Sequence, residues 1–309
     1  MSPDKPTAEF PIDVDLVRAL VVAQASAWIP DAATLPLRKV AEGWDSEIWR
    51  FGDLYAVRLP RRELAAPLVL HEQRVLPGVA RRLAPLGIPV PEPVVCGVPG
   101  GAYPWAWSVV PWIEGERGLD VPRADREDWA GPLAAALVAL HADAPADFPV
   151  NPVRGRPLAT RDAAFADRLA ALRDTRTLDD ASADQLAGLW RTGVDAPQWD
   201  RTPVWIHGDL HPGNLVSREG TLAGIIDFGD VTAGDPAYDL GVAWLAFDAP
   251  ARARFVAATD GRYDAATWRR AHAWAAAVVL MLLVHSDDNP DYFELGRDAV
   301  TQVLADAPA

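Results

Sequence analysis

Three oxygen-bearing side chains stand at fixed separations in one stretch of the chain. Asp209 and Asn214 lie five residues apart in a loop that begins His207-Gly208, and Asp227 follows the next apolar run. Carboxylate and amide oxygens are ligands that Mg²⁺ prefers, and a carboxylate can also orient a hydroxyl and accept its proton. Phosphoryl transfer needs this combination, together with positive charge near the phosphates.

Each of these residues alone has a simpler explanation, since Asp and Asn often bond to backbone groups in turns. Protein kinases, however, space the Asp and Asn of their catalytic loop in the same way, in H-R-D-x-x-x-x-N. Asp227-Phe228-Gly229 also matches the kinase motif D-F-G. The combination of both motifs favours a catalytic role for these residues over a role in stabilising turns.

Several polar neighbours are expected to have structural roles. His207 follows an apolar run and is expected to brace the loop. For His211 two interpretations stay open: it contacts the site residues, or it is a solvent-exposed residue of the loop. Asp235 and Asp239 are expected to cap and anchor the next helix, because Gly-Asp-Pro is a helix-start signal.

The elements that must position these residues fall into two groups. A helix is expected over residues 13–28 and another over residues 67–86, from apolar residues at helical spacing. Short apolar runs separated by turn residues predict five strands, over residues 35–41, 47–51, 55–59, 94–97 and 105–110.

Beyond residue 113 Ala/Leu-rich helices dominate, the first over residues 123–141, and only residues 203–230 again suggest a small sheet. A boundary near residue 113 is expected to separate a nucleotide-binding region, 1–112, from a catalytic and acceptor-binding region, 113–309. The start of the chain, residues 1–10, is polar and expected to be flexible.

Composition narrows the function. The 309 residues include one cysteine, Cys96, so no internal disulfide can form. Cys96 is expected to be a buried side chain. Because nothing requires an oxidising compartment, a cytoplasmic location is expected. The formal charge of −14 disfavours nucleic acid as a partner. The most apolar stretch, residues 273–284, is shorter than the roughly 20 residues that cross a bilayer, so no membrane association is expected.

The motifs H-G-D-x-x-x-x-N, I-D-F-G-D and G-D-P-A-Y-D-L together resemble the aminoglycoside phosphotransferase and choline-kinase-like family, over nearly the whole chain. The resemblance implies a bilobal α+β fold of the protein-kinase type, with a five-stranded antiparallel sheet and a helix before a mostly helical lobe. It implies ATP and Mg²⁺ as cofactors. It also implies Asp209 as the catalytic base and Asn214 and Asp227 as Mg²⁺ ligands.

The resemblance also assigns nucleotide-binding residues. Glu72 would pair with a basic residue of the third strand, where Arg58 replaces the usual phosphate-binding lysine. Two interpretations stay open for Ser46, on the first hairpin: it contacts a phosphate of the nucleotide, or it forms hydrogen bonds within the hairpin turn. The adenine hinge would run from Val110 to Ile113 and use the Pro111 carbonyl and the Ile113 amide.

The acceptor is less well defined. The acidic run Asp287, Asp288, Asp291 and Glu294 is either a charged linker or, as the resemblance implies, part of a site for a cationic acceptor, with Asp287 and Asp288 contacting it. The predicted function is ATP-dependent phosphorylation of a small-molecule hydroxyl, foremost on a cationic amino sugar such as an aminoglycoside antibiotic. Alternatives are a choline-, sugar- or macrolide-type acceptor, a metal-dependent phosphoesterase suggested by Asp209-Leu210-His211, and a non-catalytic nucleotide-binding module.

Overall fold

The computed structural model describes residues 6–286 and 289–306, and the chain divides into two compact units. Of the described residues, the sheet unit comprises 6–114 and Gly224–Gly229, and the helical unit comprises Gly115–Ala223 and those from Asp230 onward. The predicted α+β class is confirmed, because a five-stranded antiparallel sheet precedes a region made mostly of helices.

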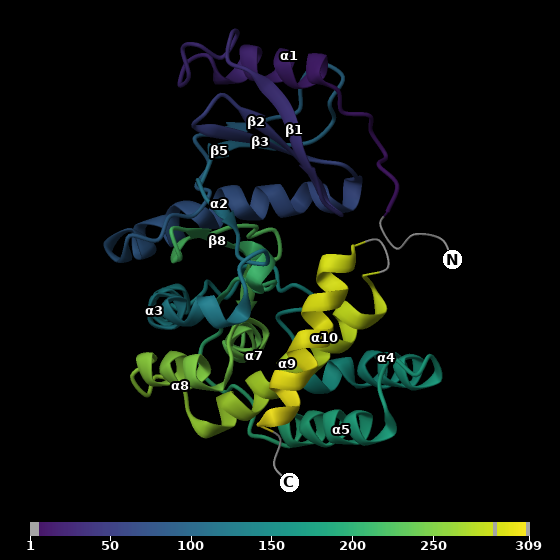
Figure 1. Ribbon diagram of the computed structural model, residues 1–309. Helices are drawn as coiled ribbons and strands as arrows, with labels where there is room; N and C mark the ends of the chain where they lie inside the picture. The colour runs from purple at the N-terminus through teal and green to yellow at the C-terminus, as the bar shows by residue number, and fades with distance from the viewer. Residues whose placement is uncertain (1–5, 287–288, 307–309) are drawn as a thin grey trace. The chain divides into compact units, whose positions relative to one another are not determined.

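All five predicted strands of the sheet unit are present, with slightly shifted ends. The elements are α1 (Val14–Ala25), β1 (Leu37–Glu42), β2 (Ser46–Phe51), β3 (Tyr55–Pro60), α2 (Ala66–Leu83), β4 (Val95–Gly97) and β5 (Trp107–Pro111). The strand order is β1-β2-β3-β5-β4, and every neighbouring pair is antiparallel. Figure 1 shows α1 and α2 on opposite faces of this sheet.

The alternation of side chains along the strands gives the two faces different characters. On β3, Val57 and Leu59 are fully buried in the apolar core that also contains Val17 and Leu20 of α1. Arg58 lies between them in sequence and so points to the opposite face, toward α2. The period of two along β3 therefore places this arginine against the helix that carries Glu72.

The helical unit contains most of the helices and two small sheets. Its helices are α3 (Ala130–Leu140), α4 (Asp162–Asp174), α5 (Asp180–Val194), α6 (Ala237–Leu240), α7 (Val242–Ala246), α8 (Ala249–Ala258), α9 (Ala265–Val284) and α10 (Pro290–Ala305). Its strands are β6 (Glu116–Arg117), β7 (Val204–Ile206), β8 (Leu215–Arg218), β9 (Thr221–Ile225), which ends in the sheet unit, and β10 (Thr232–Gly234). β10 pairs with β7, and β8 lies between β6 and β9.

Helix α9 forms the centre of this unit. It packs against α4, α5, α6, α7 and α10, and its Trp274, Val279 and Leu280 are buried. Among the described residues, no helix combines the length and the apolar character needed to span a membrane.

One local expectation is refined by the structure and another is wrong. The region predicted as a helix from residue 123 begins as a 3-10 helix, Arg123–Trp129, and becomes α-helical only at Ala130. Pro132 explains the change, because proline has no N–H to donate to the carbonyl four residues earlier. Cys96 is exposed rather than buried, since it lies on the short edge strand β4 with its side chain turned away from the core.

A half-buried histidine of α9 makes stability depend on pH. His272 stacks on Trp244 at 4.4 Å between ring centroids, and its Nε2 lies 2.8 Å from the Val303 carbonyl oxygen. Burial lowers the pKa of His272, although the Val303 carbonyl and Asp306 oppose this shift and Arg252 adds to it.

Because the folded pKa of His272 is depressed, its favourable contribution is complete above the unfolded value of about 6.5 and is lost as the pH falls below that value. We expect the His272→Phe variant, which keeps the stacking, to flatten the loss of unfolding free energy between pH 7.5 and pH 5 by up to about 1.4 kcal/mol per pH unit. Urea unfolding of both proteins across this range measures the difference. Parallel curves would contradict the assignment.

Candidate active site

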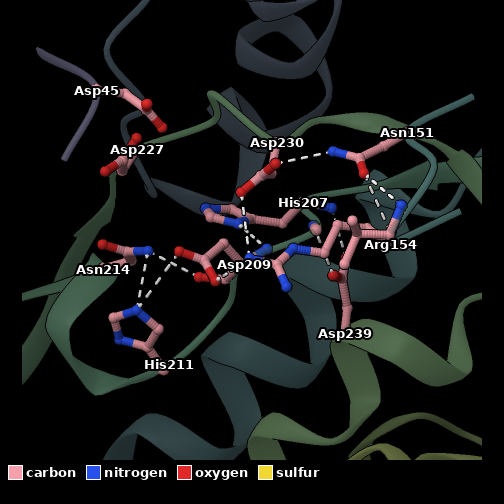
Figure 2. Close-up of polar contacts among 12 residues, drawn as sticks. Asp45, Asn151, Arg154, His207, Asp209, His211, Asn214, Asp227, Asp230 and Asp239 are labelled. Carbon is pink, nitrogen blue, oxygen red and sulfur yellow. Dashed lines mark hydrogen bonds and ion pairs between the residues drawn. The ribbon is translucent and has the colours of Figure 1, made fainter. Parts of the chain in front are cut away.

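The loop between β7 and β8 carries two of the three side chains with which the sequence analysis began, Asp209 and Asn214 (Figure 2). A 3-10 turn, Pro212–Asn214, closes the loop before β8. The Asn214 Nδ2 donates a hydrogen bond to the backbone oxygen of Asp209 at 2.7 Å. Because the amide nitrogen is held in this way, the orientation of the Asn214 Oδ1, a hard oxygen ligand, is fixed as well.

The backbone of this loop requires glycine at position 208. Gly208 has a φ of +84°, and a Cβ at this position would lie 2.4 Å from the carbonyl oxygen of Asp230. Any other residue would strain the backbone and force two segments apart. This explains why the sequence has His207-Gly208 where the protein-kinase pattern has His-Arg.

The carboxylate of Asp239, on α6, anchors the loop from the core of the helical unit. Its Oδ2 accepts the N–H of His207 at 2.7 Å, and its Oδ1 accepts the N–H of Gly208 at 3.0 Å. The same Oδ2 lies 3.1 Å from the His141 Nε2, whose Nδ1 lies 2.7 Å from the Tyr263 hydroxyl. Asp239 therefore fixes the two residues immediately before Asp209.

This role corrects the prediction that Asp239 caps the following helix. Asp235 does accept the N–H of Ala237 at 3.0 Å, as a residue before a helix should. Asp239 is fully buried and its oxygens face the β7–β8 loop instead. His207 is also fully buried and its Nδ1 accepts the N–H of Asp209 at 3.2 Å, so it braces the loop as expected.

The environment of Asp209 favours its ionised form. Its Oδ1 lies 3.3 Å from the Arg154 Nη2, and its Oδ2 lies 3.7 Å from the His211 Nε2. Burial by itself would raise the pKa of Asp209, but the nearby His211 ring and the charge of Arg154 outweigh it and hold the pKa well below its usual range. The side chain nevertheless remains 30% exposed. A carboxylate that is charged at neutral pH and accessible can accept a hydrogen bond from a hydroxyl.

Two residues that the sequence analysis did not single out complete this environment. The Asn151 Nδ2 donates to the Asp230 Oδ1 at 2.8 Å, and the Arg154 Nη2 lies 3.5 Å from the Asp230 Oδ2 (Figure 2). The Arg154 guanidinium also lies over the ring of Tyr238 at 5.6 Å. No motif marks either residue, because the contacts join positions about eighty residues apart in the chain.

In the sheet unit, Arg58 links two carboxylates. Its Nη2 donates to the Asp227 Oδ1 at 2.8 Å, and its Nε lies 3.1 Å from the Glu72 Oε2. Burial would lower the pKa of Arg58, but the charges of Asp227 and Glu72 outweigh it and raise the pKa. Asp227 has a φ of +61°, which is uncommon for a residue with a Cβ and is often found at functional sites.

A model of the APH family, described as a phosphotransferase enzyme family, matches residues 36–274 of the chain. The chain belongs to the APH family. It is therefore a phosphotransferase, an enzyme that transfers phosphate to a hydroxyl acceptor. The resemblance seen in the sequence is confirmed.

Solved structures of similar fold agree with this APH-family membership. The GDP complex of aminoglycoside 2′-phosphotransferase-IIIa has a TM-score of 0.68 at 20% identity and covers 93% of this chain and 98% of its own. A macrolide 2′-phosphotransferase type I has a TM-score of 0.61 at 21% identity, covering 98% and 100%. The macrolide 2′-phosphotransferase MphH from Brachybacterium faecium has 0.60 at 19% identity, covering 96% and 100%. These likenesses show that the APH-family chain has the kinase-like fold.

The other nucleotide-binding positions expected of an APH-family member lie in the sheet unit. Ser46 is buried at the start of β2, and its carbonyl accepts the N–H of Gly43 at 2.9 Å, which closes the hairpin turn. Val110 and Pro111 end β5, where Trp112 donates its N–H to the Leu54 carbonyl at 2.8 Å.

The Ile113 side chain packs close to Gly224, where a Cβ would lie 2.8 Å from its Cγ2. Asp287 and Asp288, predicted to contact the acceptor, lie outside the described residues.

The two residues predicted as magnesium ligands each offer an oxygen of the kind that this ion prefers. Asp227 supplies a carboxylate whose side chain is 49% exposed, and Asn214 supplies an amide oxygen held by its bond to Asp209. Mg²⁺ prefers such oxygen ligands and usually keeps several waters, so two protein ligands together with phosphate oxygens are an ordinary set for it.

The geometry of Arg58 leads to a prediction about nucleotide binding. A guanidinium fixed by two carboxylates can form forked contacts to phosphate, so we expect Arg58→Ala to raise the KM for the nucleotide several-fold. Steady-state kinetics with varied Mg²⁺-ATP measure this change. Arg38→Ala, an exposed arginine of β1 in the same sheet, is the control and should leave the KM unaltered. An unaltered KM in Arg58→Ala would remove Arg58 from this role.

Proposed function

We propose that this APH-family enzyme transfers the γ-phosphate of ATP to a hydroxyl group of a small molecule, with Asp209 as the catalytic base. One observation carries the proposal: the Asp209 carboxylate is accessible and lies beside Arg154, which favours its ionised form, on a loop whose backbone Asp239 holds from the core. A carboxylate in this state can orient the acceptor hydroxyl and take its proton as the oxygen attacks phosphorus. The bond from the γ-phosphorus to the leaving oxygen breaks in the same reaction, and ADP is released.

Asn214 and Asp227 are the proposed ligands of Mg²⁺. When bound, the ion neutralises charge on the phosphate oxygens. Arg58 adds a permanent positive charge that Glu72 and Asp227 hold in place. Asn214 has a second effect, because its bond to the Asp209 carbonyl ties the position of the amide to that of the base.

The nucleotide assignment rests on supporting evidence from other members of the fold. Solved structures similar to this chain are described as complexes with GDP and with ADP. The proposed contact for the adenine ring is the segment from Val110 to Ile113, which comprises the end of β5 and the two residues after it. The Pro111 carbonyl and the Ile113 amide are its proposed hydrogen-bonding groups.

A cationic amino sugar is the acceptor that the sequence favours most. The formal charge of −14 supports it, and structures similar to this chain are described as complexes with kanamycin, gentamicin and streptomycin. Asp291 and Glu294, in the first turns of α10, are the described members of the predicted acidic run. Each already lies against an arginine, since Asp291 is 3.0 Å from the Arg117 Nη2 and Glu294 contacts Arg297. Macrolides are a second candidate, because other similar structures are macrolide 2′-phosphotransferases.

An acceptor panel with Mg²⁺-ATP tests the function. The panel contains amino sugars, macrolides, choline, neutral sugars and hydroxy acids, and ADP release is measured by a coupled assay. Acceptor-dependent ADP release supports the phosphotransferase. Release of phosphate from monoesters without a nucleotide would favour a phosphoesterase, and nucleotide binding without turnover with any acceptor would favour a binding module.

A further inference from the structure

A pocket in the helical unit contains three arginines. Arg154 enters it from the loop that precedes α4, and Arg161 and Arg168 enter it from the start and middle of α4. Positions 161, 165 and 168 are spaced by four and three residues, so their side chains lie along one face of the helix. The pocket thus receives positive charge from two consecutive segments of the chain.

Two of these arginines have no ion-pair partner in the part of the chain that the structure describes. Across residues 6–286 and 289–306, no carboxylate forms an ion pair with Arg161 or Arg168, and the one polar contact of Arg168 is its Nε at 3.4 Å from the His285 Nε2. Burial lowers the pKa of Arg168, and the charges of Arg161 and Arg154 lower it further. Guanidinium groups that repel one another in this way favour an anion among them.

Arg154 connects the pocket to the catalytic base. Its Nη2 lies 3.3 Å from the Asp209 Oδ1, so a molecule that lies against Arg154 is close to the base. The Arg154 Nε is buried and has no hydrogen-bond partner among the residues that the structure describes. A buried donor is unfavourable while it is unpaired, so a ligand atom that accepted this hydrogen bond would relieve the cost.

The rest of the pocket lining is apolar and largely aromatic. Phe165, Tyr238 and Trp274 line it and are buried, and Tyr238 and Trp274 pack together with ring centroids 4.7 Å apart. Val278 and Met281 of α9 add aliphatic surface that is partly exposed. Such a wall favours a flat, apolar body next to the anionic group.

We propose that this pocket binds the acceptor, and that the acceptor is a hydroxyl compound with a carboxylate or phosphate group on an apolar, largely aromatic body. The inference rests on the proposed function, because it assigns the substrate class of the same site. The overall charge of −14 does not oppose it, since the field within a pocket depends on the side chains that line it. The pocket therefore argues against a cationic amino sugar at this position.

Three probes of matched shape test the charge preference without a nucleotide. They are para-(hydroxymethyl)benzoate, its neutral amide, and the corresponding benzylamine, which differ in charge and share the ring and the hydroxyl. Titration calorimetry should show the benzoate binding at least about tenfold more tightly than the amide, and the amine most weakly. Equal affinities, or tightest binding of the amine, overturn the inference.

Arginine variants test whether the pocket is the site. Arg168→Gln and Arg161→Gln should each weaken benzoate binding about tenfold and leave amide binding within about twofold. Arg191→Gln, an exposed arginine of α5, is the control and should change neither. If Arg168→Gln fails to fold, Arg161→Gln still decides, and Arg161→Lys should recover part of the affinity. Benzoate binding that no pocket variant weakens overturns the inference.

A turnover measurement separates this inference from the proposed function. With Mg²⁺-ATP, the benzoate should stimulate ADP release in the wild type and not in Asp209→Asn, which should still bind it. ADP release with amino sugars but not with the benzoate or other acidic hydroxyl compounds would uphold the phosphotransferase and overturn the acidic acceptor. Charge-selective binding of the benzoate without ADP release would likewise show that the pocket does not hold the acceptor.

Discussion

The Asp209→Asn variant is expected to lose about a thousandfold in kcat while its affinity for Mg²⁺-ATP stays within about twofold of the wild type. The amide has nearly the shape of the carboxylate, but it cannot accept the proton of a hydroxyl. Arg154 and His211, which hold the carboxylate ionised, lie beside the substituted group and remain in place. Steady-state kinetics with an active acceptor and calorimetry with the nucleotide measure the two quantities separately.

Asp184→Asn is the matched control for this experiment. Asp184 is an exposed carboxylate of α5 that pairs with Arg173, so its loss should alter neither kcat nor nucleotide affinity. A variant at position 209 that retained wild-type kcat would exclude Asp209 as the base. A large loss of nucleotide affinity would instead assign Asp209 to nucleotide binding.

The Asp239→Ala variant is expected to lose both stability and activity. Removal of the Asp239 carboxylate leaves the N–H groups of His207 and Gly208 and the ring of His141 without their buried acceptor. Removing one partner from such a buried network costs about 3–5 kcal/mol of unfolding free energy. The same groups position Asp209, so kcat should fall at least about a hundredfold at a temperature where the variant is still folded. Urea unfolding and kinetics at low temperature measure the two effects.

Tyr263→Phe separates the positioning role of Asp239 from simple destabilisation. Tyr263 belongs to the same network through His141, but among the described residues its hydroxyl forms no hydrogen bond with the β7–β8 loop. Loss of the Tyr263 hydroxyl should lower the free energy of unfolding by about 1 kcal/mol and leave kcat nearly unaltered. If Asp239→Ala lost stability but kept wild-type kcat at low temperature, Asp239 would be a structural residue without influence on Asp209.

Much of the fold was predictable because it depends on local patterns. Short apolar runs separated by turn residues mark the strands of the sheet unit, along which successive side chains alternate between the two faces, and α2 repeats its apolar residues at helical spacing. The position of Arg58 on α2's side of the sheet follows from the same alternation. The 3-10 start before α3 and the exposed Cys96 were missed, because one proline and one edge strand override the average pattern.

The sequence by itself determined the kinase-like class and the residue types of the β7–β8 loop, since Asp209, Asn214 and Gly208 lie within a few positions of one another. Only the tertiary structure decided which groups surround the loop. Asp239 and Arg154 reach it from about thirty and fifty-five residues away. A motif records short-range spacing, whereas the protonation of a carboxylate and the charge of a pocket are set by whatever folding brings within a few ångströms. For the same reason the arginine pocket, and with it the proposed acidic acceptor, could not be foreseen from a net charge of −14.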